Sequence, residues 1–90
     1  MYSVYVLHSK KENKLYIGFT ANLKRRIEDH SKGKVNVTRN WLPLVFIYAE
    51  LYANKKDALQ RERFFKTGWG RQYLNKILVN TLKNFSSSKI

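Results

Sequence analysis

Five residues able to do chemistry occur in series along this 90-residue chain: Tyr5, Tyr16, Arg26, His30 and Glu62. A phenol and an imidazole can transfer protons, and a guanidinium can neutralise a growing negative charge. A carboxylate can hold a hard metal cation such as Mg²⁺. These groups can act together only if the fold brings them to one place.

The first helical pattern places an arginine and a histidine one turn apart. At about 100° per residue, Leu23 and Ile27 mark the buried stripe of a helix predicted over residues 22–32. Arg26 and His30 flank that stripe, so both side chains should be half-desolvated neighbours on one face. The alternative is a snorkelling arginine and a boundary histidine without chemistry.

A second helical pattern places a carboxylate among apolar residues. Ala58 and Phe65 define the inward side of a helix predicted over residues 55–66. Glu62 falls between them, where a charge costs desolvation free energy unless a cation compensates it. Lys66, four residues on, is the structural partner, and a bound metal is the functional one. The excess of positive charge in the chain favours the functional interpretation.

The composition points to a polyanionic partner. Eighteen Lys and Arg against six Asp and Glu give a net charge of +12, and 43% hydrophobic residues indicate a folded globule. No apolar run approaches the roughly 18 residues of a membrane-spanning helix, and no leader pattern is present. We therefore expect a cytoplasmic, nucleoid-associated protein that binds nucleic acid and no membrane. The chain has no cysteine, which excludes a thiolate nucleophile and a cysteine-ligated zinc site.

The hydrophobic periodicity predicts a single α+β domain. Alternating residues indicate three strands and apolar residues at helical spacing indicate three helices, in the order ββαβαα. This order predicts a three-stranded mixed or antiparallel sheet flanked by helices. The expected strands are 2–8, 15–19 and 44–52, and the expected helices are 22–32, 55–66 and 71–83. The domain should cover residues 1–82, followed by a frayed tail over 83–90.

The order of these residues resembles the GIY-YIG nuclease family, above all its compact stand-alone bacterial members related to the excision-repair incision domain. Tyr16-Ile17-Gly18 matches the second triplet of that family, whereas Ser3-Val4-Tyr5 keeps only the tyrosine of the first. The stretch "NLKRRIEDHSKG" is similar to the family's arginine-and-histidine helix, and "ALQRERFFK" to its glutamate helix. The resemblance covers residues 2–80.

The resemblance implies an endonuclease that hydrolyses DNA with one Mg²⁺ or Mn²⁺ ion, selects its substrate by structure and acts in DNA repair; RNA is not excluded. In this scheme Glu62 is the metal ligand, Arg26 neutralises phosphoryl charge, and Tyr16 is the preferred general base, with Tyr5 beside it or exchanging the role. His30 would orient a tyrosine hydroxyl or take its proton. Gly18 and Asn75 are possible additional site residues. We expect a monomer.

The remaining residues receive simpler interpretations. The other acids, Glu50 among them, are interpreted as surface, turn or cap positions. Trp69 either stacks on a base or, the preferred interpretation, plugs the core and caps the last helix. Two rival functions remain, namely a non-catalytic nucleic-acid-binding domain with the nuclease fold and a basic structural protein, and neither explains an inward Glu62. Binding of the nucleic-acid backbone is assigned to basic residues and one aromatic residue: Lys24, Lys32, Lys34, Arg39, Trp41 and Lys66.

Overall fold

A computed structural model describes residues 1–86 of the chain. It contains three strands, β1 (Tyr2–Ser9), β2 (Lys14–Thr20) and β3 (Leu44–Tyr52). Its helices are α1 (Leu23–Ser31), the short 3₁₀ helix η1 (Arg39–Trp41), α2 (Lys55–Phe65), α3 (Gly68–Ile77) and α4 (Val79–Ser86). The predicted α+β class and the order of strands and helices are confirmed.

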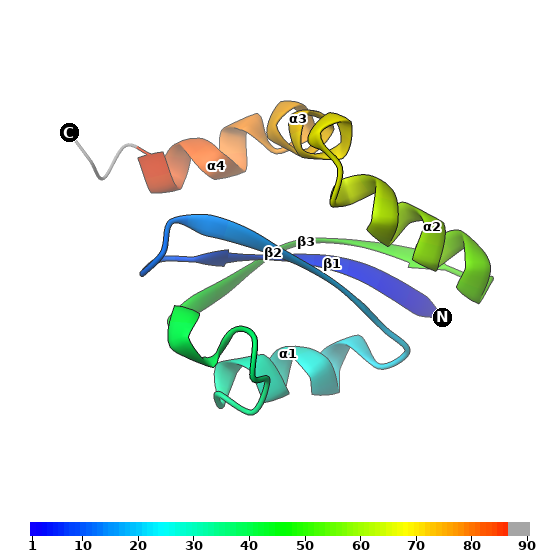
Figure 1. The fold of residues 1–90 in the computed structure, drawn as a ribbon, viewed down its shortest axis with the longest axis horizontal. Helices are drawn as coiled ribbons and strands as arrows, with labels where there is room; N and C mark the ends of the chain where they lie inside the picture. The colour runs from blue at the N-terminus through cyan, green and yellow to red at the C-terminus, as the bar shows by residue number, and fades with distance from the viewer. Residues whose placement is uncertain (87–90) are drawn as a thin grey trace.

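The sheet has the order β2–β1–β3, and both neighbours pair antiparallel to β1. Figure 1 shows α1 on one face of the sheet and α2, α3 and α4 on the other. Because helices cover both faces, β1 is buried from Ser3 to Ser9. Its alternating side chains divide between the layers: Val4 and Val6 join the apolar core under α2 and α3, whereas Tyr5 faces α1.

The main core lies between the sheet and α2–α4. It consists of residues from two strands and two helices together with Leu78: Val4, Val6, Ile17, Ala58, Phe65, Leu74 and Leu78. The junction of α2 and α3 is tight, because a Cβ built on Gly70 would lie 1.8 Å from the carbonyl oxygen of Phe64. Glycine at this position therefore lets the start of α3 pack directly against the end of α2.

Side-chain caps fix where two of the predicted helices begin. Asn22 accepts a hydrogen bond from the Arg25 amide at 3.2 Å, and Asn54 accepts one from the Lys56 amide at 2.8 Å. Gly33 follows α1 with φ +73°, a conformation that side chains disfavour. The capped helices consequently begin at Leu23 and Lys55, close to the predicted bounds.

The third predicted helix is wrong in one respect, because two helices replace it. Leu78 has φ −108° and ψ 22°, which ends α3 after Ile77, and α4 begins at Val79. The bend keeps Leu74 and Leu78 buried in the core and lays α4 over the end of the β1–β2 hairpin (Figure 1). Residues 83–86, predicted to fray, are part of α4, and residues 87–90 lie outside the described residues.

Trp69 is also placed differently from the prediction. Its side chain is 78% exposed near the start of α3, so it does not plug the core. No helix in residues 1–86 is long and apolar enough to cross a membrane.

Candidate active site

Tyr5 lies at the centre of the α1 face because its neighbour across the hairpin has no side chain. Tyr5 pairs with Gly18 of β2, and a Cβ on Gly18 would lie 2.3 Å from the Tyr5 ring and hydroxyl. The glycine thus gives room for the phenol to lie flat across β2. The Tyr5 side chain is completely buried there, with its hydroxyl directed towards α1.

His30 meets this hydroxyl from the inward side of α1. Its Nε2 lies 2.8 Å from the Tyr5 hydroxyl oxygen, and its Nδ1 lies 2.7 Å from Oγ1 of Thr38. The expected boundary position of His30 is wrong, since the side chain is only 1% exposed. The segment after α1 closes over it, because Thr38 is itself completely buried. Sequence reasoning missed Thr38, which lies in what reads as a basic loop.

Burial controls the protonation of this pair. Burial, reinforced by the positive charge of Arg26, lowers the pKa of His30 to about 4, so the imidazole is neutral at pH 7. Burial also raises the pKa of Tyr5 to about 12, although a hydrogen bond with Arg26 opposes this change. At neutral pH both groups are therefore uncharged, and this pair offers hydrogen bonds rather than a phenolate.

Tyr16 shares the α1 face with Tyr5 but remains partly exposed. Its ring centroid lies 5.1 Å from that of His30 and 6.3 Å from that of Tyr5. Trp41 packs edge-on at 6.0 Å from Tyr16, and the Lys14 Nζ lies 4.1 Å from the centre of the Trp41 ring. Lys14 is a second residue that the sequence did not single out, because its contact depends on where the segment before β3 folds.

Arg26 completes the group on this face. It is half-buried on α1, and its hydrogen bond with Tyr5 raises its pKa, so the guanidinium remains charged. The structure therefore brings together four of the five predicted catalytic residues, which we call the tyrosine–histidine cluster: Tyr5, Tyr16, Arg26 and His30.

Glu62 approaches from the other layer of the fold, on α2. Its side chain is 19% exposed, and its Oε2 accepts a hydrogen bond from the Lys66 Nζ at 3.1 Å, the structural pairing that the sequence offered. The carboxylate nevertheless lies close enough to raise the pKa of Tyr5 through its charge. Residues 1–86 contain no group of three or more acidic, histidine or cysteine side chains that would form a metal site by themselves.

A cation that keeps most of its waters fits this donor set better than one that needs a protein cage. Mg²⁺ binds through one or two carboxylates and completes its shell with water and substrate phosphate. Glu62 supplies one carboxylate, close enough for its charge to act on Tyr5, and Lys66 would have to give way or share it. The residues present are thus compatible with one hard divalent ion.

The predicted backbone-binding residues are spread over the surface. Lys24, Lys32 and Lys34 line a shallow polar pocket of about 470 Å³ along the outer side of α1, together with Glu28 and Asp29. Arg39 and Lys66 are exposed, and Trp41 packs beside Tyr16. The structure therefore groups the three lysines next to the helix that carries Arg26 and His30.

Asn75 lies elsewhere. It is exposed on α3 and lines a pocket of about 390 Å³ between the hairpin end and α4, with His8, Asn13 and Lys14 among its neighbours. His8 and its partner Leu15 point to the α2–α4 face of the sheet, opposite the tyrosine–histidine cluster. The structure does not bring Asn75 to that cluster, and its role stays a prediction.

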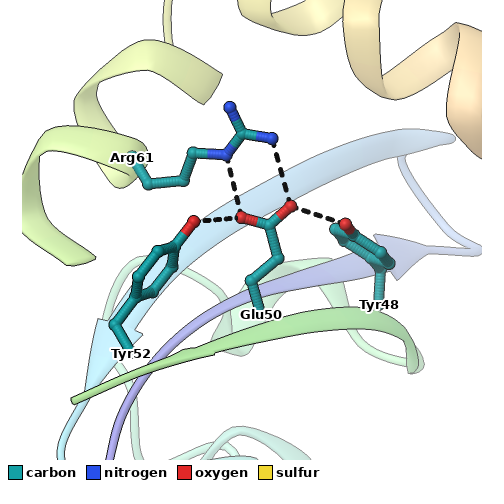
Figure 2. Close-up of polar contacts among 4 residues, drawn as sticks. All are labelled: Tyr48, Glu50, Tyr52 and Arg61. Carbon is teal, nitrogen blue, oxygen red and sulfur yellow. Dashed lines mark hydrogen bonds and ion pairs between the residues drawn. The ribbon is translucent and has the colours of Figure 1, made fainter. Parts of the chain in front are cut away.

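The prediction that Glu50 is a surface carboxylate is wrong. Glu50 is half-buried on the α2 face of β3, where Arg61 donates to both of its oxygens at 2.8 and 3.2 Å. Tyr48 and Tyr52 each donate a hydroxyl hydrogen bond to it, at 2.5 and 2.6 Å (Figure 2). We call these four residues the carboxylate cluster: Tyr48, Glu50, Tyr52 and Arg61.

Hydrogen bonds fix the charges of this second cluster. Burial by itself would raise the pKa of Glu50. The hydrogen bonds from Arg61, Tyr48 and Tyr52 lower it by more than burial raises it, so the pKa lies below its usual range. Burial and the bond to Glu50 raise the pKa of Tyr52 to about 12. The Arg61 guanidinium also lies over the rings of Phe65 and Tyr73, at 4.6 and 4.9 Å from their centroids. Arg61 thus contacts Glu50 and the rings of Phe65 and Tyr73, which are contacts that stabilise the fold.

Comparison with known proteins identifies the family of the chain. The model of the GIY-YIG catalytic domain matches residues 1–76, which includes both tyrosines, the α1 pair and Glu62. The chain belongs to the GIY-YIG family. No solved structure matches it significantly.

The relatives of this GIY-YIG domain are small bacterial proteins. A UPF0213 protein of Staphylococcus haemolyticus is 37% identical over 75 residues, which is 82% of this chain and 90% of the relative. A UPF0213 protein of Clostridium perfringens is 36% identical over 87 residues, 96% of this chain and 92% of the relative. One from Bacillus licheniformis is 41% identical over 63 residues, covering 69% of this chain and 64% of the relative.

Membership of the family supports a general statement about activity. GIY-YIG domains are those of endonucleases, which act on nucleic acid and generally use a divalent metal. The names of these relatives indicate no substrate or pathway.

Proposed function

We propose that this GIY-YIG protein is a structure-selective DNA endonuclease that hydrolyses phosphodiester bonds with a single Mg²⁺ or Mn²⁺ ion. The observation that carries the proposal is the tyrosine–histidine cluster itself: a buried Tyr5–His30 hydrogen bond beside an accessible phenol and a charged guanidinium. A domain that only bound nucleic acid would gain nothing from burying this bond, because phosphate contacts need exposed donors.

Arg26 is the group that meets the substrate first. Its guanidinium presents donors in a fixed fork that matches phosphate oxygens, and the contact with Tyr5 holds it at the site. As the attack proceeds, negative charge grows on the phosphoryl oxygens, and a fixed cation there lowers the barrier. Arg26 therefore binds the scissile phosphate and stabilises its transition state.

Tyr16, in its deprotonated phenolate form, is the general base that takes up a proton of the attacking water. Of the two tyrosines it is the partly exposed one, so a water molecule can reach its hydroxyl, whereas Tyr5 is fully buried with a pKa raised to about 12. His30 Nε2 lies 2.8 Å from the Tyr5 hydroxyl and fixes its position. The rings of Tyr5 and His30 both pack against the Tyr16 ring. In this proposal Tyr16 therefore remains the preferred general base.

Glu62 holds the metal in this proposal. When bound by Glu62 and phosphate oxygens, a divalent cation polarises the scissile phosphate and stabilises the leaving 3′ oxygen. The requirement for a single ion rests on the donor set, since the described residues offer Glu62 and no acidic cluster beside it. Lys66 neutralises the carboxylate until the metal is present.

The three lysines on α1 support binding of the DNA backbone. Lys24, Lys32 and Lys34 share one shallow pocket on the outer side of α1, the helix whose inward side carries His30. Such contacts read charge and shape rather than sequence, which supports selection of a branched or nicked structure. We further propose that the protein acts in DNA repair in a bacterial cytoplasm and that it does so as a monomer.

A cleavage assay tests the proposal. The purified protein is incubated with end-labelled flaps, nicked duplexes, forks and single strands of DNA, and with the corresponding RNAs, in Mg²⁺, in Mn²⁺ or in EDTA. We expect metal-dependent cleavage at the junctions of branched DNA, and none by Glu62→Gln, which keeps the shape but loses a metal ligand. Binding without cleavage in every metal would instead support the alternative of a non-catalytic binding domain.

A further inference from the structure

Trp69 is a large aromatic side chain for which neither the core nor the proposed chemistry has a use. Its side chain is 78% exposed in the first turn of α3. Tyr73, one turn later, is 39% exposed, so two aromatic residues are accessible on one side of this helix. A single exposed hydrophobic side chain is common on protein surfaces, so the surroundings of Trp69 decide what it does.

Hydrogen bonds fix the backbone that carries Trp69. The Oγ1 of Thr67 accepts from the Gly70 amide at 3.0 Å and donates to the Phe64 carbonyl at 2.6 Å. The Thr67 amide donates to the same carbonyl at 3.0 Å. The indole is therefore mounted on a fixed corner between α2 and α3, and a ligand that binds there has little backbone to order.

Gly68, directly before Trp69, has no reason inside the fold to be glycine. Among the described glycines only Gly33 has a positive φ, so the backbone of Gly68 suits any side chain. A Cβ built on Gly68 meets no atom within 4 Å. Alanine would be the better helix former at this position. What glycine provides here is open backbone, which lets a ligand beside Trp69 approach closely.

The segment that carries Trp69 has only positive charges. Residues 63–86 contain no Asp or Glu and five exposed basic side chains, namely Arg63, Lys66, Arg71, Lys76 and Lys83. Within residues 1–86 only Lys66 of these five forms an ion pair, with Glu62. A second copy of this +12 chain would bring the same charge to this surface. A nucleic acid brings negative phosphates together with flat apolar rings, so it complements both features.

We propose that Trp69 is a stacking platform for an unpaired nucleobase, and that Gly68 leaves room for the DNA strand that carries this base. In a duplex both faces of a base are covered by its neighbours, whereas a single-stranded arm offers free faces. The platform therefore selects the single-stranded arms of flaps and forks. That selection rests on the proposed nuclease function, whereas binding of an unpaired strand does not.

Intrinsic fluorescence tests the stacking directly. The chain has two tryptophans, so Trp41→Phe leaves Trp69 as the only indole. This variant is titrated in EDTA with a single-stranded oligonucleotide of mixed sequence and with a blunt duplex that has the same number of phosphates. We expect the single strand to quench the emission strongly and the duplex to leave it nearly unchanged. Equal quenching by both, or by neither, would overturn the proposal. A shift that grows with protein concentration without DNA would assign the surface to a second copy of the chain.

Binding by three variants of one residue separates stacking from simple apolar contact. Trp69 is exposed, so Trp69→Ala, Trp69→Leu and Trp69→Phe should all fold. By anisotropy in EDTA, we expect Trp69→Ala to raise the Kd for the single strand about tenfold and the Kd for the duplex less than about twofold. Trp69→Phe should restore most of the affinity, and Trp69→Leu, which has no ring, should not. A Trp69→Leu protein that binds like the parent would contradict stacking.

Gly68→Ala tests the close approach beside the platform. We expect this protein to be at least as stable as the parent in urea, and to bind the single strand several-fold more weakly. Unchanged binding by Gly68→Ala would contradict the role of Gly68.

These measurements in EDTA need no cleavage, so the two proposals can fail separately. If Trp69 discriminates single strand from duplex but no substrate is cut in any metal, the nuclease function fails and the platform stands. If branched DNA is cut but Trp69→Ala binds both DNAs like the parent, the platform fails and the nuclease function stands.

Discussion

Two polar clusters lie on opposite faces of one three-stranded sheet, and each joins strand tyrosines to a helix arginine. In the carboxylate cluster, Arg61 donates twice to Glu50, and both neighbouring tyrosines donate to the same carboxylate. In the tyrosine–histidine cluster, the hydroxyl of Tyr5 is fixed by a neutral imidazole, and the arginine contacts a phenol. Ion pairs in the described residues join Arg61 to Glu50 and Lys66 to Glu62; Arg26 takes part in neither.

The difference teaches how to distinguish a structural cluster from a candidate catalytic one that uses the same residue types. A guanidinium whose charge is already neutralised by a bidentate carboxylate has little left to offer a substrate. A half-buried guanidinium that is held by a neutral hydroxyl, with Asp29 acting on it only through its charge, keeps its hydrogen-bond donors for an anion. We therefore expect the carboxylate cluster to control stability and the tyrosine–histidine cluster, with Glu62, to control activity.

The largest expected effects come from replacing the two glutamates, Glu62 and Glu50, by glutamine in separate variants. Glu62→Gln should lower the cleavage rate by about a hundredfold or more, with a change of less than about 1 kcal/mol in the free energy of unfolding, because its partner Lys66 is exposed. Glu50→Gln should cost about 2–3 kcal/mol of unfolding free energy, because it leaves the Arg61 charge half-buried without a carboxylate.

Urea titrations and single-turnover cleavage on the same preparations measure both quantities. Cleavage by Glu50→Gln is corrected for the folded fraction and should then match the parent. Equal losses of activity in the two variants would contradict the division between the clusters.

The two arginines give the next comparison. Arg26→Ala should reduce cleavage by about 10²- to 10³-fold and weaken metal-free DNA binding only modestly, since one phosphate contact is lost. Arg61→Ala should lower the unfolding free energy, because it removes the ion pair and the packing on Phe65 and Tyr73. Fluorescence anisotropy with labelled DNA, beside the cleavage assay, measures the effects. Retention of full cleavage by a folded Arg26→Ala would remove Arg26 from the site.

Acid should destabilise the two clusters in different pH windows. The pKa of His30 falls from 6.5 to about 4 on folding, so the unfolded chain binds more protons between these values. Stability present above pH 6.5 is therefore lost as the pH falls towards 4, by on the order of 3 kcal/mol. Glu50 has a lowered pKa, so its contribution is lost only as the pH falls below about 4.5.

Unfolding measured by circular dichroism from pH 7.5 to 3.5 separates these contributions. His30→Gln should flatten the curve between pH 6.5 and 4.5, whereas Glu50→Gln should leave that slope and reduce the loss at lower pH. A parent whose stability is constant from pH 7 to 4.5 would show that His30 is not buried as a neutral imidazole.

The parts of the fold that could be predicted are those that depend on local patterns. Alternation predicted the strands, and apolar residues at helical spacing predicted the two helices that Asn22 and Asn54 cap, because periodicity and capping act over a few residues. The bend at Leu78 was missed because apolar residues at helical spacing continue through it; packing of α4 on the hairpin end, not propensity, divides the helix.

The site shows the same limit. His30 was recognised by its spacing from Arg26, but its partner Thr38 lies in a loop whose path only the fold determines. Glu50 could have been found, since Tyr48, Glu50 and Tyr52 alternate along β3 and must share one face. The missing information was which helix residue would face them, and that depends on how α2 packs across the sheet.

The smallest expected effect belongs to Asn75, which lies in neither cluster. It is exposed, and it lines the pocket of His8, Asn13 and Lys14 at the hairpin end, on the face opposite Tyr5. Exposed substitutions outside such networks usually change unfolding free energy by less than about 0.5 kcal/mol. We expect Asn75→Ala to cut within about threefold of the parent rate, measured beside Glu62→Gln on one branched substrate. A loss as large as that of Glu62→Gln would mean that the substrate also contacts the hairpin end, and the active site would then include the hairpin-end pocket.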